Sequence, residues 1–396
     1  MPLSGVAGRI WQFNHGRPPD LLALKYAKLR KQAFGFFRGT AHLFYQAATP
    51  PAAVTSAPVA GLTGDLHLEN FGLYRGDNGR ACFDVNDFDE AVLGPVAWDL
   101  VRLIASLLVG LADLDRPPSE AEALAEAFLG RYVQVLAAGG ARLADSAVLT
   151  GPIGALIRAF PSRGAQDLVD DRTNLTPAGR RLVIDHKRFL PIAPAEREAV
   201  IQRVADFADQ PPAAGPLRVR DVARLAAGTS SLGLDRYAVL TEGAAGVPGL
   251  LELKQVAAPC AAPYVRVEQP AWPSQAERVR AAERAFQAVP PAVLGAVGDS
   301  VKSFIVRDYA RTRDHLTLSP AGLAGTVRTL AEVVANGHLR GSAMPGASGP
   351  PALQAFARER GWQAELVAFA RQCAAQSQAD YAEYSQAYDR GELASA

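Results

Sequence analysis

The residues most able to do chemistry lie in two short polar segments of the first quarter of the chain. The first, "TGDLHLENFG" (63–72), places Asp65 and Asn70 in a turn between apolar neighbours. A carboxylate such as Asp65 can accept or orient the proton of a hydroxyl group, and the amide oxygen of Asn70 is a hard ligand of the kind that Mg²⁺ takes. The segment therefore suggests a general base beside a metal ligand.

The second polar segment follows one predicted hairpin later. "FDVNDFDEAVLGP" (83–95) places Asp87 and Asp89 at the end of a strand, where they add further hard oxygen ligands. A base, an amide ligand and carboxylate ligands on neighbouring loops form the set used in phosphoryl transfer, in which positioning and charge neutralisation supply most of the catalysis. A lone Asp-x-His turn is more often a local cap, so the interpretation depends on the two segments occurring together.

These segments resemble the catalytic loop of the aminoglycoside phosphotransferase and choline kinase group and the stretch that follows it. "GDLHLEN" (64–70) is similar to the group's H-G-D-x-H-x-x-N pattern, with Thr63 in place of the leading His. "NDFDEAVLGPVAWDL" (86–100) is similar to I-D-[FW]-x-D-a-x-x-G-d-P-x-x-D-L. The resemblance implies a protein kinase-like fold and a transfer of phosphate to a hydroxyl group that depends on ATP and on Mg²⁺ or Mn²⁺.

The resemblance also gives roles to single residues. It implies that Asp65 is the catalytic base, that Asn70 and Asp87 hold metal, and that Asp99 has a structural role. Asp89 is a further candidate metal ligand on chemical grounds, because its carboxylate lies two residues from Asp87.

A kinase must also hold ATP, and the middle of the chain offers the parts. The small lobe of a kinase uses a Gly-rich turn between two strands and then a lysine on the third strand, which reaches the phosphates. Here "GTSSLG" (228–233) is followed by "LDRYAVLTEG" (234–243), and Lys254 lies in the next β-like run. The turn residues expected to line the phosphate site are Gly228, Thr229, Ser230, Ser231 and Gly233.

Lys254 is expected to pair with an acidic residue of a predicted helix over 274–287, either Glu277 or Glu283. The alternative is that Lys254 is an ordinary lysine on an edge strand. Arg307 lies in "SFIVRDY" (303–309), the strand expected to lead to the hinge beneath the adenine.

Two more side chains are expected to support the site. Arg38, in "FFRG", either contacts phosphate or caps its loop, and both possibilities stay open. His67 is expected to brace the catalytic loop through a hydrogen bond to the backbone rather than to take part in the chemistry.

The order of these motifs differs from that of an ordinary kinase, in which the Gly-rich turn and lysine precede the catalytic loop. Circular permutation explains the order, since compact domains tolerate it when the cut lies in an exposed loop. We therefore predict an α+β, bilobal, circularly permuted kinase-like fold. Residues 1–210 would form the first part of the large catalytic lobe, 211–312 the small ATP-binding lobe, and 313–396 the closing helices of the large lobe.

The chain as a whole resembles one bacterial family with this motif order, the domain of unknown function 2252 family. That family is thought to be kinase-like, without an established substrate, so the resemblance implies a mechanism more than a biological role. The matching motifs are "FGFFRG" (34–39), "GDLHLENFG" (64–72), "NDFDE" (86–90), "WDLVRL" (98–103), "GTSSLG" (228–233), Lys254 and "HLR" (338–340).

Hydrophobic periodicity and turn residues predict the elements that would position these motifs. The predicted helices cover 20–47, 94–114, 118–138, 194–209, 274–288 and the region from 321 onward, interrupted at 341–351. The predicted strands cover 58–62, a hairpin within 71–87, 236–243, 249–256 and 303–309.

Composition limits the partners. Forty-one basic and forty acidic residues give a formal charge of +1, which argues against a protein built mainly to bind nucleic acid. Three separated cysteines suggest neither a disulfide framework nor a zinc site. Neither a signal peptide nor a membrane span is expected, so a cytoplasmic location is the default.

The expected partners are ATP and an acceptor that bears a hydroxyl group, most simply a small molecule. Two alternatives stay open: a nucleotide-binding pseudokinase with a regulatory role, and an enzyme of the same fold that transfers AMP. A metallophosphoesterase, suggested by "GDLH" (64–67), is disfavoured because its accompanying motifs are absent from the sequence.

Overall fold

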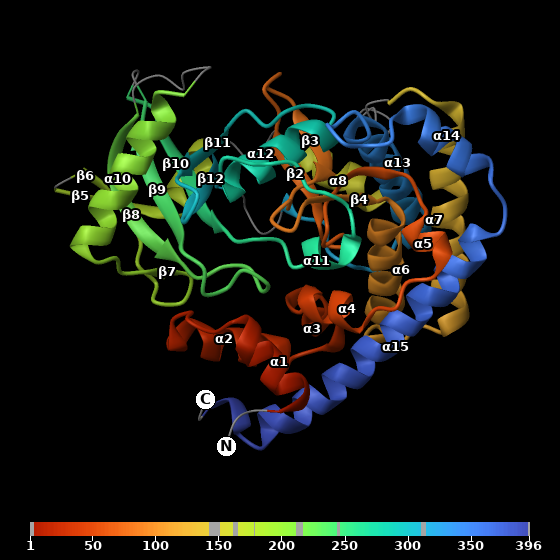
Figure 1. The fold of residues 1–396 in the computed structure, drawn as a ribbon. Coiled ribbons are helices and arrows are strands. Elements are labelled where there is room, and N and C mark those ends of the chain that lie inside the picture. The colour runs from red at the N-terminus through yellow and green to blue at the C-terminus, as the bar shows by residue number, and fades with distance from the viewer. Residues whose placement is uncertain are drawn as a thin grey trace.

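The computed structural model describes residues 4–141, 151–160, 165–177, 179–210, 217–243, 246–309 and 314–394. A six-stranded antiparallel sheet lies on one side of the molecule and a larger helical body on the other (Figure 1). The predicted α+β class and the small antiparallel sheet are confirmed.

The helical body is built from both ends of the chain. α6 (Ala97–Ala112) and α7 (Pro118–Ala138) pack with α13 (Leu323–Gly341), α14 (Pro350–Arg358) and α15 (Trp362–Asp389) around one apolar core. α6 is apolar on almost every side and is buried along nearly its whole length, as expected for a central helix. The helices predicted over 94–114 and 118–138 are thus confirmed.

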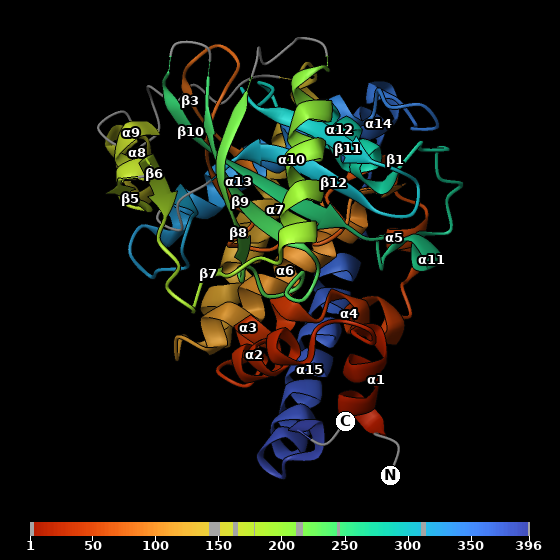
Figure 2. The ribbon, with the colours of Figure 1, turned by 90° about the vertical axis from the view of Figure 1, so that its left-hand side faces the viewer.

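The N-terminal region forms several short helices where the sequence suggested one helix and its continuation. Their bounds are α1 (Gly5–Phe13), α2 (Pro19–Leu29), α3 (Ala33–Gly39), α4 (Ala41–Ala47) and α5 (Ala52–Thr55). Apolar residues of α1, α2, α3 and α4 form a cluster with the last turns of α15, which runs beside them in Figure 2. α1 and the 3₁₀ turn Glu392–Ala394 therefore lie in the same corner of the molecule.

Two small antiparallel pairs carry the polar segments. β1 (Val59–Leu62) pairs with β4 (Val92–Pro95), and β2 (Phe71–Arg75) pairs with β3 (Ala81–Val85) as the predicted hairpin. The first polar segment runs from the end of β1 to the start of β2, and the second runs from the end of β3 to β4. The pairings therefore bring the two segments side by side.

The six-stranded sheet has the order β11-β12-β10-β9-β8-β7, and every neighbouring pair is antiparallel. Its strands are β7 (Phe189–Leu190), β8 (Arg218–Leu225), β9 (Arg236–Glu242), β10 (Pro248–Val256), β11 (Leu294–Gly298) and β12 (Ser303–Asp308). The sheet therefore begins before residue 211, where we expected the small lobe to start. The buried side chain of Phe189 explains this, because it packs with Leu225 on one face of the sheet.

α10 (Pro194–Ala208) covers one face of the sheet and contributes Val200 and Val204 to a cluster with Leu251 and Leu253 of β10. Side chains alternate between the faces of a strand. Glu252 and Lys254 therefore point away from α10 and toward the helical body, although both are buried. α12 (Gln275–Phe286) links the sheet to α13.

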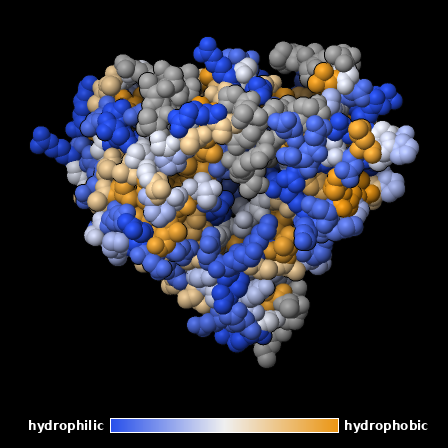
Figure 3. Space-filling view, turned by 180° about the vertical axis from the view of Figure 1, so that it is seen from behind, coloured by the Kyte–Doolittle hydropathy of each residue, from blue (hydrophilic) through white to orange (hydrophobic). Residues whose placement is uncertain are grey.

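The remaining described elements are α8 (Gly151–Ala159), α9 (Ala165–Asp170), β5 (Thr173–Thr176), β6 (Gly179–Leu182), α11 (Ala262–Val265) and a 3₁₀ turn (Glu392–Ala394). Across the described ranges, no helix has both the length and the apolar character needed to cross a bilayer. On the face seen in Figure 3, hydrophobic residues lie in separate patches among hydrophilic ones.

Candidate functional site

A cavity of about 560 Å³ lies between the sheet and the polar segments of the helical body. It gathers twelve of the fifteen site residues expected from the sequence, although they come from distant parts of the chain. Gly233, Glu277 and Glu283 do not line it. The residues that do are Arg38, Asp65, His67, Asn70, Asp87, Asp89, Gly228, Thr229, Ser230, Ser231, Lys254 and Arg307.

A row of polar side chains on α6 holds the loop that carries Asp65. Asp99, fully buried in the first turn of α6, accepts hydrogen bonds from the backbone N–H groups of Thr63 at 2.9 Å and Gly64 at 3.0 Å. His338, from the "HLR" motif on α13, places its Nε2 3.3 Å from Asp99 Oδ2. Buried charges persist only when they are paired or hydrogen-bonded, so Asp99 has the structural role that the resemblance implied.

Gly64 is required by the shape of this loop. Its φ of +77° falls in the left-handed region, and a Cβ built on it would lie 1.9 Å from the carbonyl oxygen of Glu90 in the second polar segment. The carbonyl of Gly64 also accepts a hydrogen bond from the Tyr45 hydroxyl at 2.5 Å. The close approach of two backbones therefore brings Asp65 up to the second polar segment.

Asp65 is oriented by Arg102, the next charged residue along the buried face of α6. Arg102 is fully buried and places Nε 2.9 Å and Nη2 2.8 Å from the same oxygen, Asp65 Oδ1. Oδ2 has no hydrogen-bond partner among the described residues and could accept a further hydrogen bond. Burial raises the pKa of Asp65 to about 7 against the opposing charge of Arg102. A carboxylate with a pKa near neutrality suits general base catalysis.

Asn70 and His67 brace the loop from inside. The amide nitrogen of Asn70 donates to the carbonyl oxygens of Asp65 at 3.3 Å and Asp87 at 3.2 Å, which joins the two polar segments and turns Oδ1 away from both. His67 Nδ1 accepts from the backbone N–H of Glu69 at 3.2 Å, which confirms the expected bracing contact. Arg38 forms an ion pair with Glu69, so it contacts the loop that carries Asp65 directly.

Lys254 meets the second polar segment across the cavity. Its ammonium lies 3.1 Å from Asp87 Oδ1 and 2.6 Å from Asp89 Oδ2, while its side chain is only 3% exposed. Burial alone would raise the pKa of Asp87, but Lys254 and then Arg307 hold that pKa well below its usual range. Burial and the neighbouring Asp87 raise the pKa of Asp89 to about 6.

This pairing replaces the partners that we expected for Lys254. Glu277 forms an ion pair with Arg280 at 2.6 Å within its own helix. Glu283 is buried, and burial raises its pKa to about 7, but no bond joins it to Lys254 in the described part of the chain. The carboxylates of Asp87 and Asp89 lie within ion-pair distance of the lysine, and those of Glu277 and Glu283 on α12 do not. Lys254 also lies on the third strand of the sheet, so it is not an edge-strand lysine.

The donor set fits a hard divalent cation. The carboxylates of Asp87 and Asp89 and the amide oxygen of Asn70 line one cavity, and oxygen ligands of this number suit Mg²⁺, which keeps several waters. Within the described ranges, no three His, Cys, Asp or Glu side chains converge as a metal cluster. Such a cation would therefore have two carboxylates, one amide and Lys254 as its protein neighbours.

Beside Lys254, a charged triad lines the sheet side of the cavity. Glu252 accepts from Arg236 at 2.8 Å and from Arg307 at 3.1 Å. These arginines, in that order, outweigh burial and lower the pKa of Glu252 to about 2. Arg307 also donates to the carbonyl oxygen of Asn86 at 3.1 Å, so it links the sheet to the second polar segment.

The Gly-rich turn is held by cations from α2 and from the loop that precedes it. Arg17 and Lys25 donate to the carbonyl oxygen of Ser230 at 3.1 Å and 2.6 Å, and Lys28 donates to that of Gly228 at 3.2 Å. The backbone N–H groups of residues 228–231 make no hydrogen bond within the described structure. With its carbonyls taken by cations, the turn keeps its N–H groups available for an anion.

Gly233 does not line the cavity; it makes room for Arg17, one of the three cations (Arg17, Lys25 and Lys28) that hold the Gly-rich turn. Its φ is +96°, and a Cβ on it would lie 2.9 Å from the side chain of Arg17. The glycine therefore lets Arg17 reach the carbonyl oxygens of Ser230 and Leu232.

A second cavity of about 180 Å³ adjoins the first, and both are lined by Asn86, Arg307 and His315. Its other walls are largely apolar. They include Leu73, Tyr74, Phe160, Leu168, Leu250, Val293 and Tyr309.

Our sequence analysis missed Arg102, which orients Asp65, and the cations that hold the Gly-rich turn. Arg102 and Asp99, whose structural role was expected, are two charges three residues apart in an otherwise apolar helix, which is a signal for buried partners. The cations Arg17, Lys25 and Lys28 gave no such signal, because charged residues on loops and short helices are usually solvated.

Comparisons with known proteins identify a family and no function. A family model described as "Uncharacterized protein conserved in bacteria (DUF2252)" matches residues 17–387, which agrees with the resemblance noted from the motifs. No curated protein and no solved structure matches the chain.

Proposed function

Because the chain belongs to the DUF2252 family of uncharacterized bacterial proteins, whose description names no activity, we propose a function from the site itself. We propose that the protein is an ATP- and Mg²⁺-dependent phosphotransferase that acts on a hydroxyl group of a small molecule. The observation that carries the proposal is the convergence of Asp65, Asn70, Asp87, Lys254 and the Gly-rich turn on one cavity.

The order of elements around the cavity supports a kinase-like site. The Gly-rich turn joins β8 to β9, Lys254 lies on β10, and α12 precedes β11 and β12. Protein kinases place a Gly-rich loop, a lysine on the third strand and a helix in this sequence. α1 contacts α15 and the 3₁₀ turn Glu392–Ala394, so a chain with the ordinary motif order could connect these two regions directly, which supports the proposed circular permutation.

The two adjoining cavities have the chemistry that a nucleotide needs. The apolar cavity of about 180 Å³ suits a base, and the polar one of about 560 Å³ suits the phosphates. Tyr309 Oη and Gln287 Oε1, from residues that line the apolar cavity, are buried without a hydrogen-bond partner among the described residues. These atoms would give the base polar contacts.

In the proposed reaction, the acceptor oxygen attacks the γ-phosphorus of ATP, the bond from that phosphorus to the β,γ-bridging oxygen breaks, and ADP leaves. The hydroxyl proton passes to Oδ2 of Asp65, which Arg102 keeps aimed at the cavity. Lys254 and the N–H groups of the turn hold the phosphates. The cation held by Asn70, Asp87 and Asp89 would neutralise phosphate charge.

The test compares binding with turnover. We expect ATP with Mg²⁺ to raise the melting temperature of the wild type. Lys254→Ala should need at least a tenfold higher ATP concentration for the same rise. Asp65→Asn should keep binding but lose turnover, whereas Asp77→Asn, at an exposed turn, should change neither. A wild type that binds no nucleotide would refute the proposal.

Labelled ATP distinguishes the remaining alternatives when the protein is incubated with a metabolite extract. Label from the γ-phosphate in a product indicates phosphate transfer, and label from the α-phosphate indicates AMP transfer. Nucleotide binding without any labelled product indicates a regulatory pseudokinase.

A further inference from the structure

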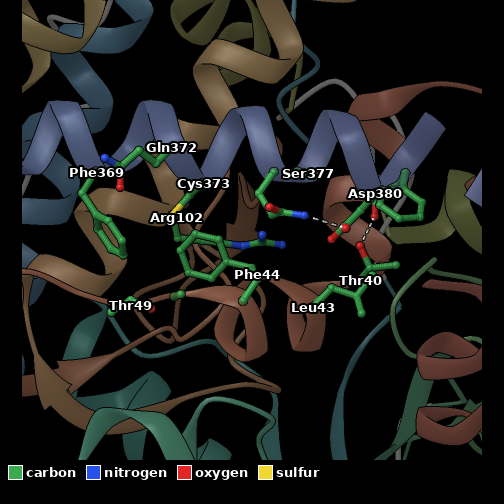
Figure 4. Close-up of a pocket in the computed structure, with 14 residues that line it drawn as sticks. Thr40, Leu43, Phe44, Thr49, Arg102, Phe369, Gln372, Cys373, Ser377 and Asp380 are labelled. Atoms are coloured by element: carbon green, nitrogen blue, oxygen red, sulfur yellow. Dashed lines mark hydrogen bonds between the residues drawn. The ribbon is translucent and has the colours of Figure 1, made fainter. Parts of the chain in front are cut away.

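A third cavity lies on the far side of the arginine that orients Asp65. It has a volume of about 190 Å³ and opens between the α3–α4 region and α15 (Figure 4). None of its lining residues lines the 560 Å³ cavity. Arg102 therefore stands between two separate spaces: it binds Asp65 on one side and lines this cavity on the other.

Arg102 has hydrogen-bonding capacity that the fold does not use. Nε donates to Asp65 Oδ1, and Nη2, which lies 2.8 Å from the same oxygen as an ion pair, donates to the carbonyl oxygen of Phe37 at 2.7 Å. Nη1 is buried and has no hydrogen-bond partner among the described residues. The guanidinium is fixed by the rings of Phe37 and Phe44, whose centroids lie 3.6 Å and 4.8 Å from its carbon. A buried donor without an acceptor is costly, and this one cannot swing away to find water.

The rest of the cavity is amphipathic. Phe44 and Phe369 present rings beside Arg102, while Thr40, Ser377 and Asp380 stand at the other end (Figure 4). The volume is somewhat larger than the roughly 150 Å³ of a protein cavity that holds benzene. The space therefore suits one ring or a short branched chain with a polar group.

We propose that this cavity binds a small carboxylate with an apolar body, whose carboxylate accepts the two N–H groups of Arg102 Nη1. A guanidinium edge prefers a carboxylate over a neutral acceptor. The acidic lining residue, Asp380, is already paired with Arg9 at 3.4 Å and accepts from Gln376 at 2.9 Å, so it does not compete for Nη1.

The site lies one side chain away from the candidate base. A carboxylate on Nη1 would share the guanidinium with Asp65 and alter how firmly that carboxylate is held. Binding itself does not depend on the proposed function; only a change in turnover on binding rests on it.

The test measures binding of benzoate to the full chain by ligand-observed NMR or calorimetry, with benzyl alcohol as the uncharged match. We expect benzoate to bind at least tenfold more tightly than benzyl alcohol. Ala47→Trp, at the exposed rim of the cavity, should weaken benzoate binding at least tenfold. Gln46→Trp is the control, because Gln46 is exposed on the same helix and does not line the cavity.

Arg102→Gln is a second variant, with circular dichroism to check the fold. A folded variant should lose the preference for benzoate over benzyl alcohol. Equal binding of the two probes by the wild type, no binding of either, or equal losses in Ala47→Trp and Gln46→Trp would each overturn the proposal. If the site binds carboxylate but the protein never binds ATP, this proposal stands and the proposed function falls.

Discussion

Lys254→Met would test the central ion cluster directly. The substitution leaves the carboxylates of Asp87 and Asp89 facing each other where an ammonium lay 3.1 Å and 2.6 Å from them. Breaking a fully buried ion pair costs about 3–5 kcal/mol. Because the side chain of Asp87 is 46% exposed and stays hydrated, we expect the free energy of unfolding to fall by about 1–3 kcal/mol in Mg²⁺-free buffer.

Magnesium should then stabilise the variant more than the wild type, because two carboxylates without their ammonium attract a divalent cation more strongly. A ligand at one hundred times its Kd adds about 2.7 kcal/mol, so millimolar Mg²⁺ should recover most of the loss. Urea denaturation with and without Mg²⁺ measures this. The control is Lys302→Met, which breaks the surface pair with Asp235 and should cost under about 1 kcal/mol. Equal Mg²⁺ effects in variant and wild type would refute our assignment of the two carboxylates to a metal site.

Three further predictions concern the loop and its surroundings. Gly79→Ala, with a φ of +76° but open space around it, should lower the free energy of unfolding by about 1–2 kcal/mol from backbone strain alone. Gly64→Ala has the same strain and also forces a Cβ against the Glu90 carbonyl oxygen, which adds about 1–3 kcal/mol. Equal losses in the two variants would contradict the proposed backbone contact. Asp99→Asn should cost about 2–3 kcal/mol by chemical denaturation, because buried N–H groups lose a charged acceptor, while Glu126→Gln, on an exposed helix face, should cost nothing measurable. The pKa of Glu283 is about 7 in the folded state, raised from an ordinary value of 4.5, so the fold loses stability as the pH rises from about 4.5 to about 7, and the loss is complete above that. Glu283→Gln should therefore be more stable than wild type by about 1–3 kcal/mol at pH 8 and equal to it near pH 4; a constant difference across this range would refute the buried-acid explanation.

The loop residues could be predicted from sequence because their spacing is local. Asp65 and Asp87 follow the ends of β1 and β3 by a few residues, Asn70 directly precedes β2, and the β2–β3 hairpin between the two segments brings them together. Lys254 was predictable in the same way, since alternation along β10 fixes which face it occupies. The parts that depend on local pattern were thus accessible without coordinates.

What the sequence did not predict depends on contacts between distant elements. The partner of Lys254 was expected on α12, but the choice between α12 and the Asp87 loop depends on which carboxylate reaches the ammonium first. The clamp from Arg17, Lys25 and Lys28 joins helices to a turn about two hundred residues away. No local sequence spacing predicts a contact between segments so far apart in the chain.

The support of the Asp65 loop by α13 has a consequence for synthesis. A ribosome releases the loop early, but His338, which contacts the buried Asp99, emerges only after most of the chain is made. Until then a half-translated polypeptide holds exposed acids and an apolar α6 without their neighbours, a condition in which chaperones bind. Assembly of the site thus waits for translation to near its end, and a nascent fragment should be inert.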